Sequence, residues 1–206
     1  MNEYEARSVI IECCRRLYDR GFFPGVDGNV SLRVDGGRML ITPTGVCKDM
    51  LSERQLSLVS LEGEHISGDK PSTEAHMHIE VFRRRAEINA CIHAHSPNIG
   101  AFVLAGEPVD TRCAPFAYMH LGVIGEVGYI TPGTERLHEA VGEEVSRGFN
   151  ALLLFGHGSL VLGRGMQEAF ERVDLFESYA GMLLRAQLLG GARALDEDEL
   201  SKVRSG

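Results

Sequence analysis

One uninterrupted apolar run constrains the fold more than any other part of this chain. Residues 151–155 read Ala-Leu-Leu-Leu-Phe, and a strand without polar residues is typical of one buried on both faces of its sheet. Apolar residues at helical spacing predict helices within 6–17, 133–145 and 166–189, and these helices could pack against the two faces. The chain therefore predicts a sheet with helices packed against it.

The connections between strands predict how that sheet is built. Two more helices are expected, one capped at its start by Ser72 or Thr73 and one over 97–105. Several neighbouring strands are joined by short turns, which parallel β-α-β units could not provide. We expect an α/β fold with a central, mostly antiparallel sheet sandwiched by helices. The remaining strands are predicted at 29–34, 39–42, 56–60, 90–95, 118–121, 123–130 and 159–163.

Composition limits the domain count and the kinds of partner. A chain of 206 residues with 44% hydrophobic residues predicts one domain over 1–206, with 195–206 as a mobile tail. The formal net charge is −8 and no basic run is longer than Arg83–Arg85, which argues against nucleic acid and anionic membranes as partners. Five cysteines without C-x-x-C spacing argue against disulfides, and residues 1–5 lack the start of a signal peptide. We expect a cytoplasmic protein.

Histidines at the ends of two predicted strands indicate a metal site. His93 and His95 are two residues apart on an apolar strand, so their side chains point to the same face. His157 stands between glycines after the 151–155 strand and is the third candidate ligand. A single histidine is more often a hydrogen-bonded core or loop residue, whereas three imidazoles with an open coordination position are typical of catalytic zinc.

Three loops carry residue types that bind anions. Each combines glycine or a helix N-terminus with short polar side chains, which can present N–H groups, amides or hydroxyls to a phosphate. Taken alone, the first two are better explained as hairpin turns. Glu74, which follows the third, is favoured near a helix start by the helix dipole for purely structural reasons. The candidate residues are Gly28, Asn29, Thr44, Gly45, Ser72 and Thr73.

The order of these motifs resembles the class II aldolase/adducin family, over roughly residues 3 to 190. The resemblance implies a homotetramer with active sites between subunits and a Zn²⁺ ion held by His93, His95 and His157. It places Glu74 near the ion as a base and, in some resting states, as a fourth ligand. It also implies that the three loops form one phosphate pocket. The motifs are Gly28-Asn29-Val30-Ser31, Ile41-Thr42-Pro43-Thr44-Gly45, Pro71-Ser72-Thr73-Glu74, His93-Ala94-His95, and His157-Gly158 before a long helix.

The activity implied by this resemblance is aldol cleavage of a short ketose 1-phosphate, such as L-fuculose 1-phosphate. The products would be dihydroxyacetone phosphate and a small aldehyde, with the divalent ion stabilising an enediolate and Glu74 carrying the proton at its carbon. In related aldolases a tyrosine serves the aldehyde oxygen, often from a neighbouring subunit. Tyr118 is the candidate here, and Tyr129 is the alternate.

The lysines argue against a Schiff-base aldolase. The chain contains only Lys48, Lys70 and Lys202, and none lies in an apolar run that would lower its pKa. A mechanism through a lysine imine is therefore not expected.

Other functions on the same scaffold stay open. Related pentulose-phosphate 4-epimerases tend to have aspartate at the Glu74 position, whereas a methylthioribulose-phosphate dehydratase or a sugar-acid-phosphate decarboxylase would retain the histidines. Thr73 stands where many of these aldolases have a second serine, and 125–134 is shorter than in the fuculose enzymes, so the substrate is left open. A non-catalytic, adducin-like binding module is disfavoured because all three histidines and Glu74 are present. Other divalent ions, such as Mn²⁺ or Co²⁺, are alternatives to Zn²⁺.

Overall fold

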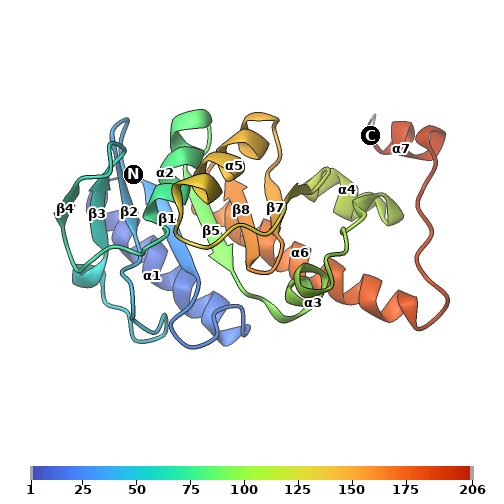
Figure 1. The fold of residues 1–206 in the computed structure, drawn as a ribbon, viewed down its shortest axis with the longest axis horizontal. Coiled ribbons are helices and arrows are strands. Elements are labelled where there is room, and N and C mark those ends of the chain that lie inside the picture. Colours follow the sequence, from blue (N-terminus) through green and yellow to red (C-terminus); the bar gives the residue numbers. More distant parts are fainter. Residues whose placement is uncertain (1, 205–206) are drawn as a thin grey trace.

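An eight-stranded sheet forms the centre of the molecule, in the order β4-β3-β2-β1-β5-β8-β7-β6 (Figure 1). The computed structural model describes residues 2–204. Neighbouring strands are antiparallel except for β6 and β7, which are parallel, so the mostly antiparallel sheet predicted from the sequence is confirmed. The strands are β1 (Asn29–Arg33), β2 (Arg38–Ile41), β3 (Ser57–Ser60), β4 (His65–Ser67), β5 (Ala90–Ala94), β6 (Gly125–Val127), β7 (Ala151–Leu154) and β8 (Gly158–Gly163).

Helices cover both faces of this sheet, as expected. On one face α2 and α5 pack side by side over a core that includes Met39, Cys91 and Leu152. On the other face α1, α3, α4 and α6 enclose a second core, which includes Ile92 and Val161. The helices are α1 (Glu3–Asp19), α2 (Ala75–Arg84), α3 (Pro97–Ala105), α4 (Pro115–Leu121), α5 (Glu135–Ser146), α6 (Met166–Gln187) and α7 (Glu197–Arg204), with short 3₁₀ turns at Glu53–Gln55 and Thr111–Cys113.

The apolar run at 151–155 behaves as predicted. All four residues of β7 are buried, with Leu152 in the core under α2 and α5 and Leu153 in the core on the opposite face. The alternation also holds in β5, where Cys91 faces α2 and α5 and Ile92 faces the other helices. His93, two residues after Cys91, therefore points to the α2 and α5 side of the sheet.

Two strands predicted in the segment between β5 and β7 differ from the structure. The segment predicted as a strand at 118–121 is part of α4, which starts at Pro115 and ends before Gly122 with φ of 66°. Proline is favoured at the first position of a helix, and the apolar run was too short to distinguish a strand from a helix by its spacing. The strand predicted at 123–130 shrinks to β6, and the exposed edge strand β4 was not predicted.

The start of α2 also differs from the prediction. Neither Ser72 nor Thr73 is the N-cap, because the helix begins at Ala75 and Glu74 occupies the cap position. Ser72 Oγ instead accepts a hydrogen bond from the Glu74 N–H at 3.2 Å, within a turn that precedes the helix. The turn leaves the carboxylate of Glu74 free to face away from the helix.

The C-terminal segment extends from one end of the molecule (Figure 1). Its helix α7 lies beside α4, and Leu200 is buried. Mobility of the tail 195–206 stays a prediction, and residues 205–206 lie outside the described part. Within residues 2–204, no helix is both long enough and apolar enough to cross a membrane.

Candidate active site

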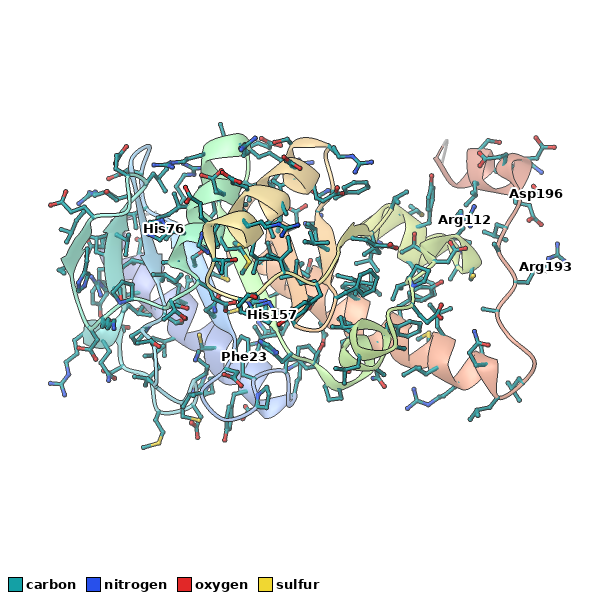
Figure 2. All side chains as sticks on the ribbon, in the orientation of Figure 1. Phe23, His76, Arg112, His157, Arg193 and Asp196 are labelled. Carbon is teal, nitrogen blue, oxygen red and sulfur yellow. The ribbon has the colours of Figure 1, made fainter. Side chains whose placement is uncertain are left out.

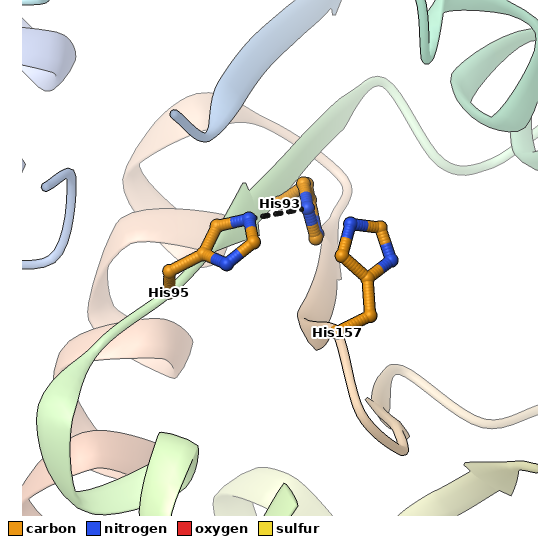
Figure 3. Close-up of side chains that lie close together, drawn as sticks. All are labelled: His93, His95 and His157. Atoms are coloured by element: carbon orange, nitrogen blue, oxygen red, sulfur yellow. Dashed lines mark hydrogen bonds between the residues drawn. The ribbon is translucent and has the colours of Figure 1, made fainter. Parts of the chain in front are cut away.

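Strand β5 and the turn between β7 and β8 bring the three predicted ligands together (Figure 3). His93 lies near the end of β5, His95 follows the strand, and His157 lies in the β7–β8 turn. Each ring offers a nitrogen that lies within 4.8 Å of the corresponding atoms of the other two. The register explains this convergence, since Ala94 of β5 pairs with Ser159 at the start of β8.

Local contacts orient the rings for this cluster. His93 Nδ1 donates to the carbonyl oxygen of Ser159 at 2.9 Å, which leaves Nε2 of His93 facing Nε2 of His95, also at 2.9 Å. A Cβ atom on Gly158 would lie 3.1 Å from His93 and 3.4 Å from His95, so this glycine leaves room for both rings. Burial lowers the pKa of His93 to about 3 and also lowers that of His95, which favours neutral imidazoles.

Glu74 approaches the cluster from the start of α2. Its Oε1 lies 3.0 Å from His157 Nε2, and its Oε2 lies 3.4 Å from His93 Nε2. Asn29 Nδ2 donates to Oε2 at 2.7 Å. Burial raises the pKa of Glu74, but the neighbouring His93 and His157 and the hydrogen bond from Asn29 outweigh it and hold this pKa well below its usual range. The carboxyl group is therefore ionised beside the imidazoles.

A polar network behind Glu74 was missed by the sequence predictions. Asn29 and Ser31 alternate along β1 and face α2, where His78 lies on the buried side of the helix. His78 Nε2 lies 2.5 Å from Asn29 Oδ1, and His78 Nδ1 lies 2.6 Å from Ser31 Oγ. Two polar residues at alternate positions of a buried strand were a signal for this network. His76, two residues before His78 on the same helix, lies on the opposite side of α2 and is exposed.

His95, His157 and Glu74 line a cavity of about 520 Å³, and His93 is buried behind them. Figure 2 places His157 centrally in the molecule, well apart from Arg112 and Asp196 near the C-terminal end. Asp27, Pro132 and Gly133 also line the cavity and were not predicted as site residues. The full lining consists of Asp27, Gly28, Thr73, Glu74, His95, Pro132, Gly133 and His157.

The predicted phosphate residues fall into adjoining segments. Gly28 and Thr73 line the cavity, whereas Asn29 lies behind them and binds Glu74. Thr44 belongs to a loop that is joined to 70–72, because its N–H donates to the Lys70 carbonyl at 3.1 Å. Gly45 and Ser72 belong to these two segments. The structure therefore brings the three loops to one side of the molecule, and their binding of phosphate stays a prediction.

One lysine contradicts the sequence prediction about lysine environments. Lys48 is only 2% exposed, and burial lowers its pKa. Its Nζ donates to the carbonyl oxygens of Val26 at 2.7 Å and Val46 at 3.0 Å. Its burial comes from the fold rather than from neighbours in sequence, which is why the local pattern did not indicate the lowered pKa. Lys48 does not line the cavity, so it is placed to hold loops rather than to form an imine.

The two candidate tyrosines differ in position. Tyr118 lies on α4 and does not line the cavity of the single chain. Tyr129 is nearer to the histidines, because a Cβ atom on Gly156 would lie 2.9 Å from its ring. Its side chain is exposed next to the turn that carries His157. The role of either tyrosine stays a prediction.

The donor set fits a divalent metal ion. Three imidazoles and one carboxylate are nitrogen and oxygen donors of the kind that bind zinc at catalytic sites. His157 Nδ1 and Glu74 Oε1 are buried atoms without a hydrogen-bond partner among the described residues, which marks the cluster as polar and incompletely satisfied. The hydrogen bond from His93 to Ser159 is the second contact that commonly orients a metal-binding imidazole.

Comparison with known proteins identifies the family. The model of the class II aldolase and adducin N-terminal domain matches residues 8–184, which include all four donors. The chain belongs to this family. The expectation drawn from the sequence is therefore confirmed at the level of the family.

Relatives within the class II aldolase and adducin family carry out more than one reaction. The chain is 35% identical to a 3-oxo-tetronate 4-phosphate decarboxylase from Pectobacterium atrosepticum, over 98% of this chain and 94% of the relative. It is 34% identical to an L-fuculose phosphate aldolase from Methanocaldococcus jannaschii, over 86% and 95%. The solved structure of YgbL from Klebsiella pneumoniae matches with a TM-score of 0.90 and 32% identity, over 98% and 99%.

Proposed function

We propose that this protein is a divalent-metal-dependent lyase that decarboxylates a 3-oxo sugar acid carrying a terminal phosphate, with 3-oxo-tetronate 4-phosphate as the leading substrate. The cluster of His93, His95 and His157 beside Glu74 carries the proposal, because it joins a metal-binding donor set to a carboxyl group in one cavity. Similarity to decarboxylases along nearly the whole chain supports this substrate over a ketose phosphate.

The proposed reaction uses the 3-oxo group as an electron sink. The bond between C1 and C2 breaks, its electron pair moves to form the C2–C3 double bond with negative charge on the C3 oxygen, and CO₂ leaves. A bound divalent ion, which we expect to be Zn²⁺, would supply Lewis-acid stabilisation of that charge. A proton then replaces CO₂ at C2 and gives dihydroxyacetone phosphate. Glu74, held by Asn29, is positioned to pass this proton from water.

The chemistry of the leaving group favours decarboxylation. Aldol cleavage requires a group that removes the proton from the hydroxyl at the bond being cleaved, whereas CO₂ leaves without such a step. The tyrosine that serves this step in related aldolases is not among the eight residues that line the cavity of the single chain, where Asp27 and Glu74 are the carboxyl groups. Gly28 and Thr73, together with the neighbouring loops, would receive the phosphate at the opposite end of a short substrate.

Aldol cleavage of a ketose 1-phosphate such as L-fuculose 1-phosphate is the second candidate. It is supported by the similarity to an L-fuculose phosphate aldolase and by the position of Tyr129 against Gly156. Both reactions pass through the same enediolate, so one metal site could serve either. A homotetramer, in which a neighbouring subunit could supply Tyr118, and a cytoplasmic location also belong to this proposal.

Product analysis separates the two reactions. The zinc-loaded protein would be incubated with 3-oxo-tetronate 4-phosphate or with L-fuculose 1-phosphate, and dihydroxyacetone phosphate and CO₂ would be measured. We expect both products from the first substrate. The Glu74→Gln variant should be slower by about 10²- to 10⁴-fold, the usual contribution of a general acid or base. Dihydroxyacetone phosphate from fuculose 1-phosphate alone would favour the aldolase, and no product from either substrate at full metal occupancy would contradict the proposed function.

A further inference from the structure

A buried chain of hydrogen bonds links β1 and α2 to the carboxylate of Glu74. It runs from Ser31 Oγ to His78 Nδ1, from His78 Nε2 to Asn29 Oδ1, and from Asn29 Nδ2 to Glu74 Oε2, with separations of 2.6, 2.5 and 2.7 Å. The side chains of Ser31 and His78 are inaccessible, and Asn29 is only 3% exposed. Water therefore cannot readily replace a lost partner within the chain.

The donor and the acceptor of each hydrogen bond in this series can be assigned in only one way. The ionised Glu74 can only accept, so Asn29 turns its NH₂ group toward Glu74 and its carbonyl oxygen toward His78. That oxygen requires a donor, which places the His78 proton on Nε2. Burial lowers the pKa of His78 to about 4, so the ring is neutral near pH 7 and its Nδ1 accepts from the Ser31 hydroxyl. Each group thus donates toward the carboxylate.

We propose that His78 is a positioning residue that fixes the amide orientation of Asn29 and thereby holds Glu74 in place for proton transfer. This inference rests on the proposed function, in which Glu74 passes a proton to the enediolate carbon. If the Nε2–H donor were lost, the Asn29 amide could turn over and place its oxygen beside the carboxylate. The hydrogen bond to Oε2 would then become a repulsion between two acceptors, and Glu74 would lose its orientation.

The position of His78 argues against a role in packing alone. Its neighbours on the buried face of α2, Met77, Ile79 and Val81, are apolar, and a leucine would fill a similar space. A buried imidazole is favoured there only if both ring nitrogens have partners, and Asn29 and Ser31 supply them.

The experiment compares two substitutions at position 78. His78→Leu keeps much of the volume and removes the donor, whereas His78→Gln keeps an N–H at a position similar to Nε2. The zinc-loaded variants would be given saturating dihydroxyacetone phosphate in D₂O, and exchange of its C–H proton with solvent would be followed by NMR. We expect exchange to fall about 10- to 100-fold in His78→Leu, as for loss of a hydrogen bond to a charged group, and to stay within about threefold of wild type in His78→Gln.

Two further variants keep the test decisive. Ser31→Ala removes only the donor to Nδ1, so it should reduce exchange less than His78→Leu does and provides a second test if that variant does not fold. His65→Gln removes a histidine from the exposed edge strand β4, away from the network, and should exchange as wild type does. Metal content and unfolding temperature would be measured for all of them.

The possible failures can be told apart. Exchange by folded, metal-loaded His78→Leu at the wild-type rate, or an equal loss in His78→Leu and His78→Gln, would overturn the positioning role and leave the proposed function intact. If the leucine variant does not fold, wild-type exchange by Ser31→Ala would overturn it. An absence of exchange in the metal-loaded wild-type protein would instead contradict the proposed enediolate chemistry, and the inference with it.

Discussion

At the scale of single residues, the candidate site depends on how buried polar groups are paired. His93 and His95 could be predicted as a pair because a strand places alternate side chains on one face. The partners of Glu74 could not, because Asn29 reaches it only after β1 has paired with β5. Asn29 was predicted only as a phosphate-binding residue. The structure adds its hydrogen bond to the Glu74 carboxylate.

Burial of His78 predicts a dependence of stability on acid. Its pKa is about 4 in the folded protein and about 6.5 when unfolded, so the unfolded chain binds a proton that the folded chain does not as the pH falls between these values. The stability associated with the neutral ring is therefore complete above pH 6.5, declines as the pH falls from 6.5 to 4, and changes no further below 4. At pH 4.5 the loss should be about 2 to 3 kcal/mol.

Urea unfolding of the metal-free protein at pH 7 and pH 4.5 would measure this loss. His93 also has a lowered pKa and contributes to the total, so the comparison is with His78→Gln, which does not titrate. The variant should lose less stability between the two pH values than the wild type does. Parallel pH dependences for the two proteins would show that His78 does not contribute.

At the scale of elements, the loops around the cavity are tied together by contacts that are distant in sequence. Lys48 connects the loop before β1 with the loop after β2 through the carbonyls of Val26 and Val46. The second loop is in turn joined to the segment before α2, where Thr44 binds Lys70. The sequence around Lys48 did not predict this role in joining the loops, because the lysine is buried only when the loops approach one another.

Substitution of Lys48 should loosen the predicted phosphate pocket. Lys48→Met removes both hydrogen bonds and leaves two carbonyl groups without their donor, so we expect a loss of about 2 kcal/mol in the free energy of unfolding. Binding of inorganic phosphate, measured by calorimetry, should weaken about tenfold because the loops are no longer held together. Lys202→Met removes the same charge from α7 and is the control. Unchanged stability and phosphate binding in Lys48→Met would contradict this role.

Most helices and strands could be predicted from apolar spacing, and the exceptions have local causes. The strand at 118–121 was wrong because a short apolar run fits either element, and packing of α4 against α6 decides between them. The edge strand β4 has three exposed residues and gave no apolar signal. Elements that bury one clear face are predictable, whereas short elements depend on contacts made by the rest of the chain.

At the scale of the whole molecule, the sheet order is what assembles the metal donors. Strands β1, β5 and β8 are neighbours at the centre of the sheet. Their pairing brings Asn29, His93 and the turn with His157 to the same end of these strands. The sequence indicated the three histidines as ligands of one metal site, whereas the convergence of the three anion-binding loops on a single pocket followed only from the resemblance to a family. Pairing between distant strands cannot be derived from local spacing.

Metal removal should therefore lower the stability of the entire molecule. A ligand that binds only the folded state adds RT ln(1 + [L]/Kd), or about 4 kcal/mol when the free ion is a thousandfold above its dissociation constant. We expect chelation to lower the unfolding temperature of the zinc-loaded protein. His157→Ala should lose most of this response, whereas His76→Ala, an exposed histidine on α2, should retain it. An unfolding temperature that does not respond to chelation of bound zinc would contradict the three-histidine site.

The central antiparallel strands also set the order of events during folding. His93 and His157 come from distant parts of the chain, and they meet only when β5 and β8 have paired. Closing the long loop between them must precede tight metal binding, because the unfolded chain offers no preformed cluster. The metal should thus leave the rate of folding nearly unchanged and slow the rate of unfolding. The ion would therefore stabilise a sheet whose strands have already paired.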